Sequence, residues 1–179
     1  MNQILFEHTN RIVRQAIRAV QPDEAVQRAL RGRAFSGRVV LVAAGKAAWQ
    51  MAAAADDCLG SRIGAGIVIT KYDHSKGAIA DFEIWEAGHP VPDENSFAAT
   101  QRAIELVSGL RKADTVLFLL SGGGSALFEK PLIPGEQLQD ITNQLLACGA
   151  DITEINIIRK RLSAVKGGRF AELCSPAQV

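Results

Sequence analysis

The chain has 179 residues and a formal net charge of +1, with 47% hydrophobic and 22% charged residues. These proportions are ordinary for one globular domain, and the small net charge excludes a bulk electrostatic attraction to nucleic acid or to an anionic membrane. The first nine residues lack the basic start and apolar core of a signal peptide, and no apolar run approaches the length of a membrane-spanning helix.

Two helices are predicted at the start of the chain, over residues 2–20 and 22–30. Apolar residues recur at spacings of three and four in the first, and Pro22 followed by two acidic residues opens the second. Seven arginines but only two acidic residues lie between Arg11 and Arg38. Two interpretations of them stay open: an anion-binding face, or the solvated side of two amphipathic helices.

The hydrophobic pattern changes at residue 39, where a continuous apolar run predicts a strand buried on both faces. The pattern then predicts, in order, a helix at 47–59, strands at 66–70 and 82–86, a helix at 93–110 and a strand at 116–120. This alternation predicts an α/β fold with a mostly parallel sheet. Two further helices, one containing Leu138 and one capped by Thr153, close the chain.

The segment Ser121-Gly122-Gly123-Gly124-Ser125 directly follows the last of these strands. Three glycines have no Cβ to obstruct a ligand, so successive N–H groups can point into one concavity with two hydroxyls at its rim. Ligands of open α/β sheets bind at the carboxyl ends of the strands. The turn therefore predicts a seat for phosphate or carboxylate, and a merely flexible turn is the alternative.

Lys46 and His89 also follow predicted strands. The N-terminus of a helix disfavours a cation, so Lys46 indicates an anionic ligand there, with a lysine leaning into solvent as the alternative. His89 precedes Pro90, which favours an extended backbone. Contact with a ligand and a hydrogen-bonded place in a rigid loop both fit His89. Asp93 is predicted to cap the helix that follows.

A basic segment ends the predicted C-terminal helix: five of the eleven residues from Arg159 to Arg169 are basic and none is acidic. Lys166 and Arg169 bracket two glycines, an arrangement that suits a strongly charged substrate such as a nucleoside triphosphate. A solvated helix end is the alternative. Asn156 falls on the same helix face as Arg159.

The cysteines and histidines carry no metal or disulfide pattern. Cys58, Cys148 and Cys174 are far apart and odd in number, which predicts free thiols in a reducing cytoplasm. The three histidines are equally scattered and do not have the spacing of a zinc site.

Five segments, taken together and in order, resemble one family: Ala-Ala-Gly-Lys-Ala, Thr-Lys-Tyr-Asp-His, Glu-Ala-Gly-His-Pro-Val-Pro-Asp, Ser-Gly-Gly-Gly-Ser-Ala and Arg-Lys-Arg-Leu-Ser-Ala-Val-Lys-Gly-Gly-Arg. The chain resembles the glycerate 2-kinases, the bacterial and archaeal class that is sometimes called hydroxypyruvate reductase. The resemblance covers nearly the whole chain.

The resemblance implies ATP-dependent phosphorylation of D-glycerate to 2-phosphoglycerate, with Mg²⁺ or another divalent cation. It implies that residues 1–179 form an incomplete, Rossmann-like N-terminal domain, which is inactive without the smaller domain that closes over the cleft. Lys46 then takes the catalytic or phosphate-contacting role. With the residues selected above, the set expected to bind substrate or phosphate is Ser121, Gly122, Gly123, Gly124, Ser125, His89, Asn156, Lys166 and Arg169.

The chain departs from the family pattern at two positions. Asp73 stands where the family usually has Gly, which affects a tight turn, and Arg161 stands where it often has His.

Alternative functions stay open at this point: a sugar-phosphate-binding or isomerase-type domain, a dimerisation module, and a hydroxypyruvate reductase. The last is disfavoured because the chain has no Gly-x-Gly-x-x-Gly fingerprint. The expected partners are D-glycerate and ATP, without nucleic acid or membrane, and a homodimer is left open.

Overall fold

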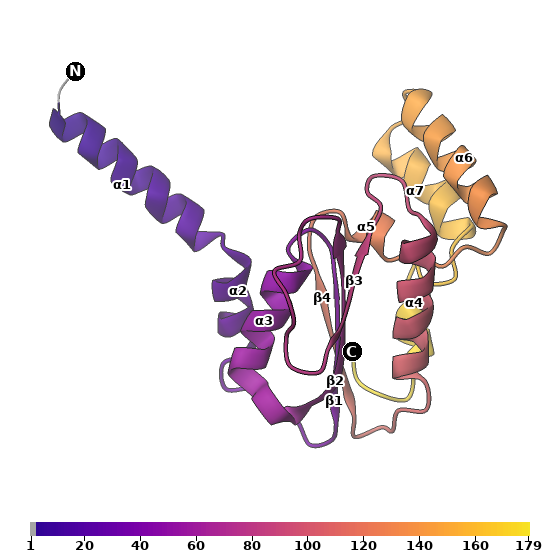
Figure 1. The fold of residues 1–179 in the computed structure, drawn as a ribbon, viewed down its shortest axis with the longest axis horizontal. Coiled ribbons are helices and arrows are strands. Elements are labelled where there is room, and N and C mark those ends of the chain that lie inside the picture. The colour runs from indigo at the N-terminus through magenta and orange to yellow at the C-terminus, as the bar shows by residue number, and fades with distance from the viewer. Residues whose placement is uncertain (1–2) are drawn as a thin grey trace.

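The computed structural model describes residues 3–179, so Asn2, at the start of the first predicted helix, lies outside it. Helices and strands alternate through most of this range (Figure 1). The elements are α1 (Gln3–Ala19), α2 (Pro22–Leu30), β1 (Val39–Ala44), α3 (Ala48–Leu59), the 3₁₀ helix η1 (Gly60–Arg62), β2 (Ile63–Lys71), β3 (Glu83–Ala87), α4 (Glu94–Val107), β4 (Thr115–Leu120), α5 (Gly124–Leu127), α6 (Gly135–Ala147), α7 (Ile152–Arg161) and α8 (Arg169–Leu173).

The four strands form one parallel sheet in the order β3-β2-β1-β4. The last residue of β1, Ala44, pairs with Ile69 of β2 and with Leu120 of β4. The turns after β1 and β4 therefore leave the sheet side by side. The predicted α/β fold with a parallel sheet flanked by helices and preceded by two helices is confirmed.

Strand β1 divides the core into two halves, because successive side chains of a strand point to opposite faces. Val40, Val42 and Ala44 pack in the cluster that includes residues of α4 and α8. Leu41 and Ala43 pack on the other side, against residues of α2 and α3. All six residues of β1 are inaccessible to solvent, so the prediction of a strand buried on both faces is confirmed.

The helix starts follow local chemistry, with one correction. Pro22 begins α2, and Asp93 caps α4 in a capping box with Ser96, both as the sequence predicts. The predicted cap at Thr153 is wrong. Asp151 caps α7 instead, because its carboxylate accepts the backbone N–H groups of Thr153 and Glu154.

Two short helices, α5 and α8, are not predicted by the sequence pattern. They have four and five residues, too few for a helical periodicity to show. Helix α8 nevertheless holds part of the core, since the ring of Phe170 contacts both Phe118 and Phe128, with centroids 5.0 and 4.8 Å away.

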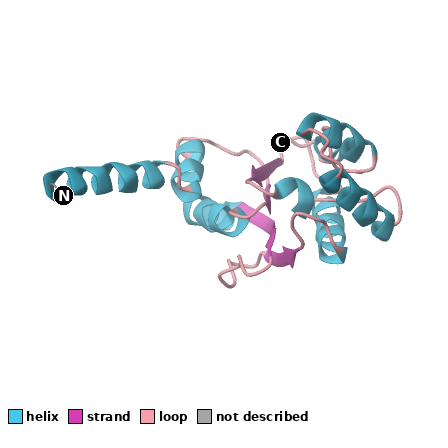
Figure 2. Ribbon diagram, turned by 90° about the horizontal axis from the view of Figure 1, so that it is seen from above, coloured by secondary structure: helices cyan, strands magenta, loops and turns pink. Residues whose placement is uncertain are grey.

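Helix α1 projects away from the body of the fold (Figures 1 and 2). None of its residues is buried, and Leu5, Phe6, Ile12 and Ile17 are each more than half exposed. Within residues 3–179, no helix combines the length and apolarity needed to cross a bilayer.

The two outer strands of the sheet differ in composition. Strand β3 reads Glu-Ile-Trp-Glu-Ala and β4 reads Thr-Val-Leu-Phe-Leu-Leu. Beside β4, Gln178 forms an isolated parallel bridge with Thr115, and the N–H of Val116 donates to the Gln178 carbonyl at 2.7 Å. This contact covers only the first part of the outer edge of β4.

Candidate functional site

The turns after β1 and β4 are hydrogen-bonded to each other. The N–H of Ser121 donates to the Ala44 carbonyl at 3.0 Å, and the N–H of Lys46 donates to the Gly122 carbonyl at 2.8 Å. Ser121 Oγ accepts the N–H of Ala47 at 3.0 Å. A Cβ on Gly45 would lie 2.1 Å from that hydroxyl, so only glycine fits there. The predicted glycine turn is thus fixed to the start of α3.

Lys46 and His89 meet at Gly123. A Cβ on Gly123 would lie 2.9 Å from Cδ2 and 3.1 Å from Nε2 of His89, and 3.3 Å from Cγ of Lys46. Gly123 has φ +88° and caps α5, a backbone conformation that suits glycine. Three residues selected from separate parts of the sequence therefore lie together at the carboxyl ends of the strands.

The surroundings of His89 are positively charged. Burial lowers the pKa of His89, and the charges of Lys46, Lys71 and Arg159 lower it further. The imidazole is therefore neutral at neutral pH. A cluster of cations with a neutral imidazole favours a bound anion.

Arg159 connects this group to a second one. Its Nη2 donates to the carbonyl of Ser125 at 3.0 Å, so α7 is tied to the end of the glycine turn. Beside it lies a 430 Å³ pocket, whose lining includes Gly124, Ser125, Asn156 and Lys166. These four predicted residues are therefore brought together, and Gly124 directly follows Gly123, the residue at which Lys46 and His89 meet.

Arg169 and Ser163 hold the turn that follows α7. Arg169 Nη1 donates to the carbonyls of Lys160 and Ser163, the second at 2.7 Å. The Ser163 hydroxyl accepts the N–H groups of Val165 and Lys166 at 3.3 and 3.4 Å. Ser163 thus lies beyond the end of α7 and is fully buried. The guanidinium of Arg169 is bonded to the carbonyls of Lys160 and Ser163, and Arg169 does not line the pocket.

Hydrogen bonds connect the segment after β2 to the start of α4 and to Lys46. Tyr72 Oη donates to Asp93 Oδ2 at 2.7 Å, and the Asn95 amide donates to Tyr72 Oη and to the carbonyl of Glu86. His74 Nδ1 lies 3.0 Å from the carbonyl of Lys46. Asp73 has φ +65°, a backbone conformation that favours glycine, the residue that the resemblance implies at this position.

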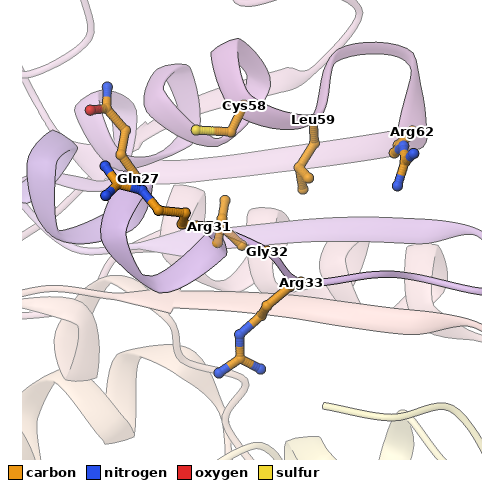
Figure 3. Close-up of a pocket in the computed structure, with 8 residues that line it drawn as sticks. Gln27, Arg31, Gly32, Arg33, Cys58, Leu59 and Arg62 are labelled. Carbon is orange, nitrogen blue, oxygen red and sulfur yellow. The ribbon is translucent and has the colours of Figure 1, made fainter.

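A different hollow lies between the ends of α2 and α3 and is lined by Arg31, Arg33 and Arg62 (Figure 3). The three guanidinium groups point in different directions (Figure 3). Arg33 Nε donates to the carbonyl of Ala29 at 2.9 Å. This arrangement favours the solvated-face interpretation of the arginine-rich segment, because the charges do not converge on one point.

Three residues of the site escaped selection from the sequence: Lys71, Arg159 and Glu129. Lys71 could have been selected because it lies in one of the five segments. Arg159 could have been selected because it shares a helix face with Asn156. Glu129 is a buried acid after α5, and nothing in the sequence marks it.

The chain is similar to glycerate 2-kinases along most of its length. It is 58% identical to the D-glycerate 2-kinase of Thermotoga maritima over 170 residues, which is 94% of this chain and 40% of that protein. It is 41% identical to the glycerate 2-kinase of Pyrococcus horikoshii over 176 residues, 91% of this chain and 39% of that protein. The crystal structure of a Thermotoga maritima glycerate kinase superposes with a TM-score of 0.92 at 56% identity, covering 98% of this chain and 42% of that one.

The chain thus spans about two fifths of the length of the relatives that it matches. Residues 8–179 match the family described as a domain of unknown function, DUF4147. The match covers nearly the whole sequence, and the solved relative has the same fold. The chain belongs to the DUF4147 family, and glycerate 2-kinases are its homologues.

Proposed function

We propose that this chain forms one wall of the active site of an ATP-dependent glycerate 2-kinase, which transfers the γ-phosphoryl group to D-glycerate. The observation that carries the proposal is the convergence of Lys46, His89 and the Gly123 backbone at the carboxyl ends of β1 and β4. The similarity to glycerate 2-kinases supports the choice of substrate.

The residues of this wall suit phosphoryl transfer, which depends mainly on positioning and on neutralising charge. Lys46 and Arg159 supply positive charge on either side of the glycine turn. The turn offers an approach to the backbone without an intervening Cβ at Gly122 and Gly123. Neutral His89 can donate a hydrogen bond to a substrate hydroxyl or accept one from it.

The residues of this wall suit the phosphate groups of ATP. Bound ATP supplies the phosphoryl group that is transferred, and the cationic cluster with its glycine turn fits phosphate oxygens. In contrast, residues 3–179 contain no cluster of three or more His, Cys, Asp or Glu that could hold a metal ion. The proposal therefore assigns no ligand of Mg²⁺ to this part of the chain.

Two alternatives make different predictions. A hydroxypyruvate reductase needs a dinucleotide site, but the glycine turn here leads into the four-residue helix α5, and the turn before α3 has a single glycine. A sugar-phosphate-binding or isomerase-type domain would use the same turn without ATP. The fold by itself does not separate these functions.

A coupled assay of the whole protein with ATP and D-glycerate tests the proposal. Formation of 2-phosphoglycerate and ADP is the expected result, and we expect none from residues 1–179 alone. NADH-dependent reduction of hydroxypyruvate without kinase activity would contradict it. The cytoplasm is the proposed compartment because all three cysteines are free thiols, and a homodimer stays a prediction.

Lys46→Ala in the whole protein should lower kcat by about 100-fold or more, because it removes a charge aimed at the transferred group. The fold should persist, since the Lys46 side chain is exposed and its backbone N–H is retained. Steady-state kinetics and circular dichroism measure the two effects. Lys112→Ala, an exposed lysine before β4, is the control and should leave kcat unchanged. Full activity of Lys46→Ala would remove Lys46 from the site.

A further inference from the structure

A buried ion pair lies behind the glycine turn. Glu129 follows α5 and is 1% exposed, and its Oε2 accepts a hydrogen bond from Lys166 Nζ. Lys166 Nζ also donates to the carbonyl of Phe128 at 3.2 Å. Removing one partner of a buried pair leaves the other charge uncompensated. The two residues therefore depend on each other.

The two ends of this pair face different surroundings. Lys166 lines the 430 Å³ pocket together with Ser125 and Asn156, whereas Glu129 is not part of its lining. Lys166 thus borders the pocket, and Glu129 lies behind it in the protein interior. Lys160 also lines the pocket, so two lysines border a cavity whose lining is otherwise mostly apolar, and their charges favour a bound anion.

Other charges act on Lys166 from the neighbouring helix. Burial lowers the pKa of the Lys166 ammonium, and Arg159 on α7 lowers it too, while the charge and hydrogen bond of Glu129 raise it. Glu129 is therefore the group that opposes loss of the proton. Its second oxygen, Oε1, is buried and has no hydrogen-bond partner, so burial of this side chain has a cost in desolvation.

We propose that Glu129 is a positioning residue that keeps Lys166 charged and holds it at the edge of the pocket, so that the pocket binds a phosphate group. The inference rests on the proposed function for the name of the ligand, whereas the two lysines on the lining favour an anion of any kind. Without the carboxylate, burial and the Arg159 charge both favour the neutral amine. Anion binding should then weaken as the pH rises and Lys166 loses its proton.

Glu129→Gln in the whole protein tests this, because it removes the charge and keeps the shape. The dissociation constant of inorganic tripolyphosphate is measured by calorimetry between pH 7 and pH 9. As the pH rises from 7 to 9, the variant should lose about tenfold more affinity than the wild type does. This is the effect expected if the Lys166 pKa falls by roughly one unit. Glu83→Gln is the matched control. It breaks the ion pair with Arg102 at the start of β3, the opposite end of the sheet, and should leave the affinity unchanged.

A second variant separates positioning from a purely structural role. Arginine remains charged without a carboxylate partner, so Glu129→Gln with Lys166→Arg should bind tripolyphosphate without the added pH dependence. A structural role of Glu129 gives no reason for such a rescue. Circular dichroism checks that both variants are folded, and if the single variant unfolds, the double variant is compared with Lys166→Arg alone.

Three outcomes would overturn the proposal: no tripolyphosphate binding by the wild type, an unchanged pH dependence in folded Glu129→Gln, or no rescue by arginine. If Glu129→Gln is unfolded, the double variant is compared with Lys166→Arg. The proposal is then overturned if tripolyphosphate binding depends on pH in the double variant but not in Lys166→Arg. A wild type that binds tripolyphosphate with the expected variant effects, but does not phosphorylate D-glycerate, contradicts the proposed function and leaves this inference standing.

Discussion

At the scale of single residues, Gly122 and Gly123 are neighbours with opposite requirements. Gly123 has φ +88°, and a Cβ there would press against His89 and Lys46. Gly122 has no neighbouring atom within 4 Å of the place where its Cβ would stand. Within the glycine run, the fold therefore requires glycine at position 123 and leaves position 122 open to other residues.

Gly123→Ala should lower the free energy of unfolding by about 1–3 kcal/mol, because it forces an L-residue into the left-handed region beside a packed imidazole. Urea denaturation followed by circular dichroism measures the change. Gly122→Ala is the matched control and should change stability by less than about 0.5 kcal/mol. Equal losses in the two variants would show that Gly123 is not a constrained position.

At the scale of elements, helix α4 depends on Asp93. This carboxylate accepts the backbone N–H of Ser96 at 3.0 Å and the hydroxyl of Tyr72, and so joins the start of α4 to the end of β2. Burial raises the pKa of Asp93, but the hydrogen bonds from Tyr72, Ser96 and Gly88 outweigh it, and the net shift is downward. Asp93 therefore stabilises the fold in its ionised form.

Asp93→Ala should cost about 1 kcal/mol of unfolding free energy through loss of the cap. Because its folded pKa is lowered, the wild type keeps this contribution above the unfolded pKa of about 4 and loses it as the pH falls further. Asp93→Asn should retain most of the cap and should lack that pH dependence. Denaturation at pH 7 and pH 3 checks both statements. A stability of Asp93→Ala equal to that of wild type at pH 7 would contradict them.

Local chemistry explains which elements the sequence could predict. Val39 to Ala44 and Asp93 are marked by an apolar run and by a cap, and both are where the pattern puts them. Helices α5 and α8 are too short to show a period, so only packing reveals them. Within the site, Lys46 and Gly123 follow strands and could be anticipated. The contact between Arg159 and Ser125 joins residues 34 positions apart and depends on tertiary structure.

At the scale of the whole molecule, α1 stands apart from the core. None of its residues is buried, and Arg18 meets Glu24 through an exposed ion pair at 3.0 Å, which contributes little. Helix α2, in contrast, places Val26 and Leu30 in the core. The stable body of the chain therefore begins at α2.

Deletion of residues 1–19 should change the unfolding free energy of the remaining chain by less than about 1 kcal/mol. Leu30→Ala, in the next helix, should cost about 2–5 kcal/mol because it opens a cavity. Thermal and urea unfolding compare the two variants. A deletion as destabilising as Leu30→Ala would mean that α1 packs on the body of the fold in solution.

The two edge strands of the sheet, β3 and β4, differ in how readily another strand could pair with them. On β3, Glu83 pairs with Arg102, and Glu86 accepts the N–H groups of His74 and Ser75, so charged side chains and a loop occupy this strand. On β4, apolar residues border a row of peptide groups that Gln178 pairs only near Thr115. An additional strand, whether from the same polypeptide or from a neighbouring molecule, would therefore join at β4. In concentrated solution, this margin is where molecules of the chain would first adhere to one another.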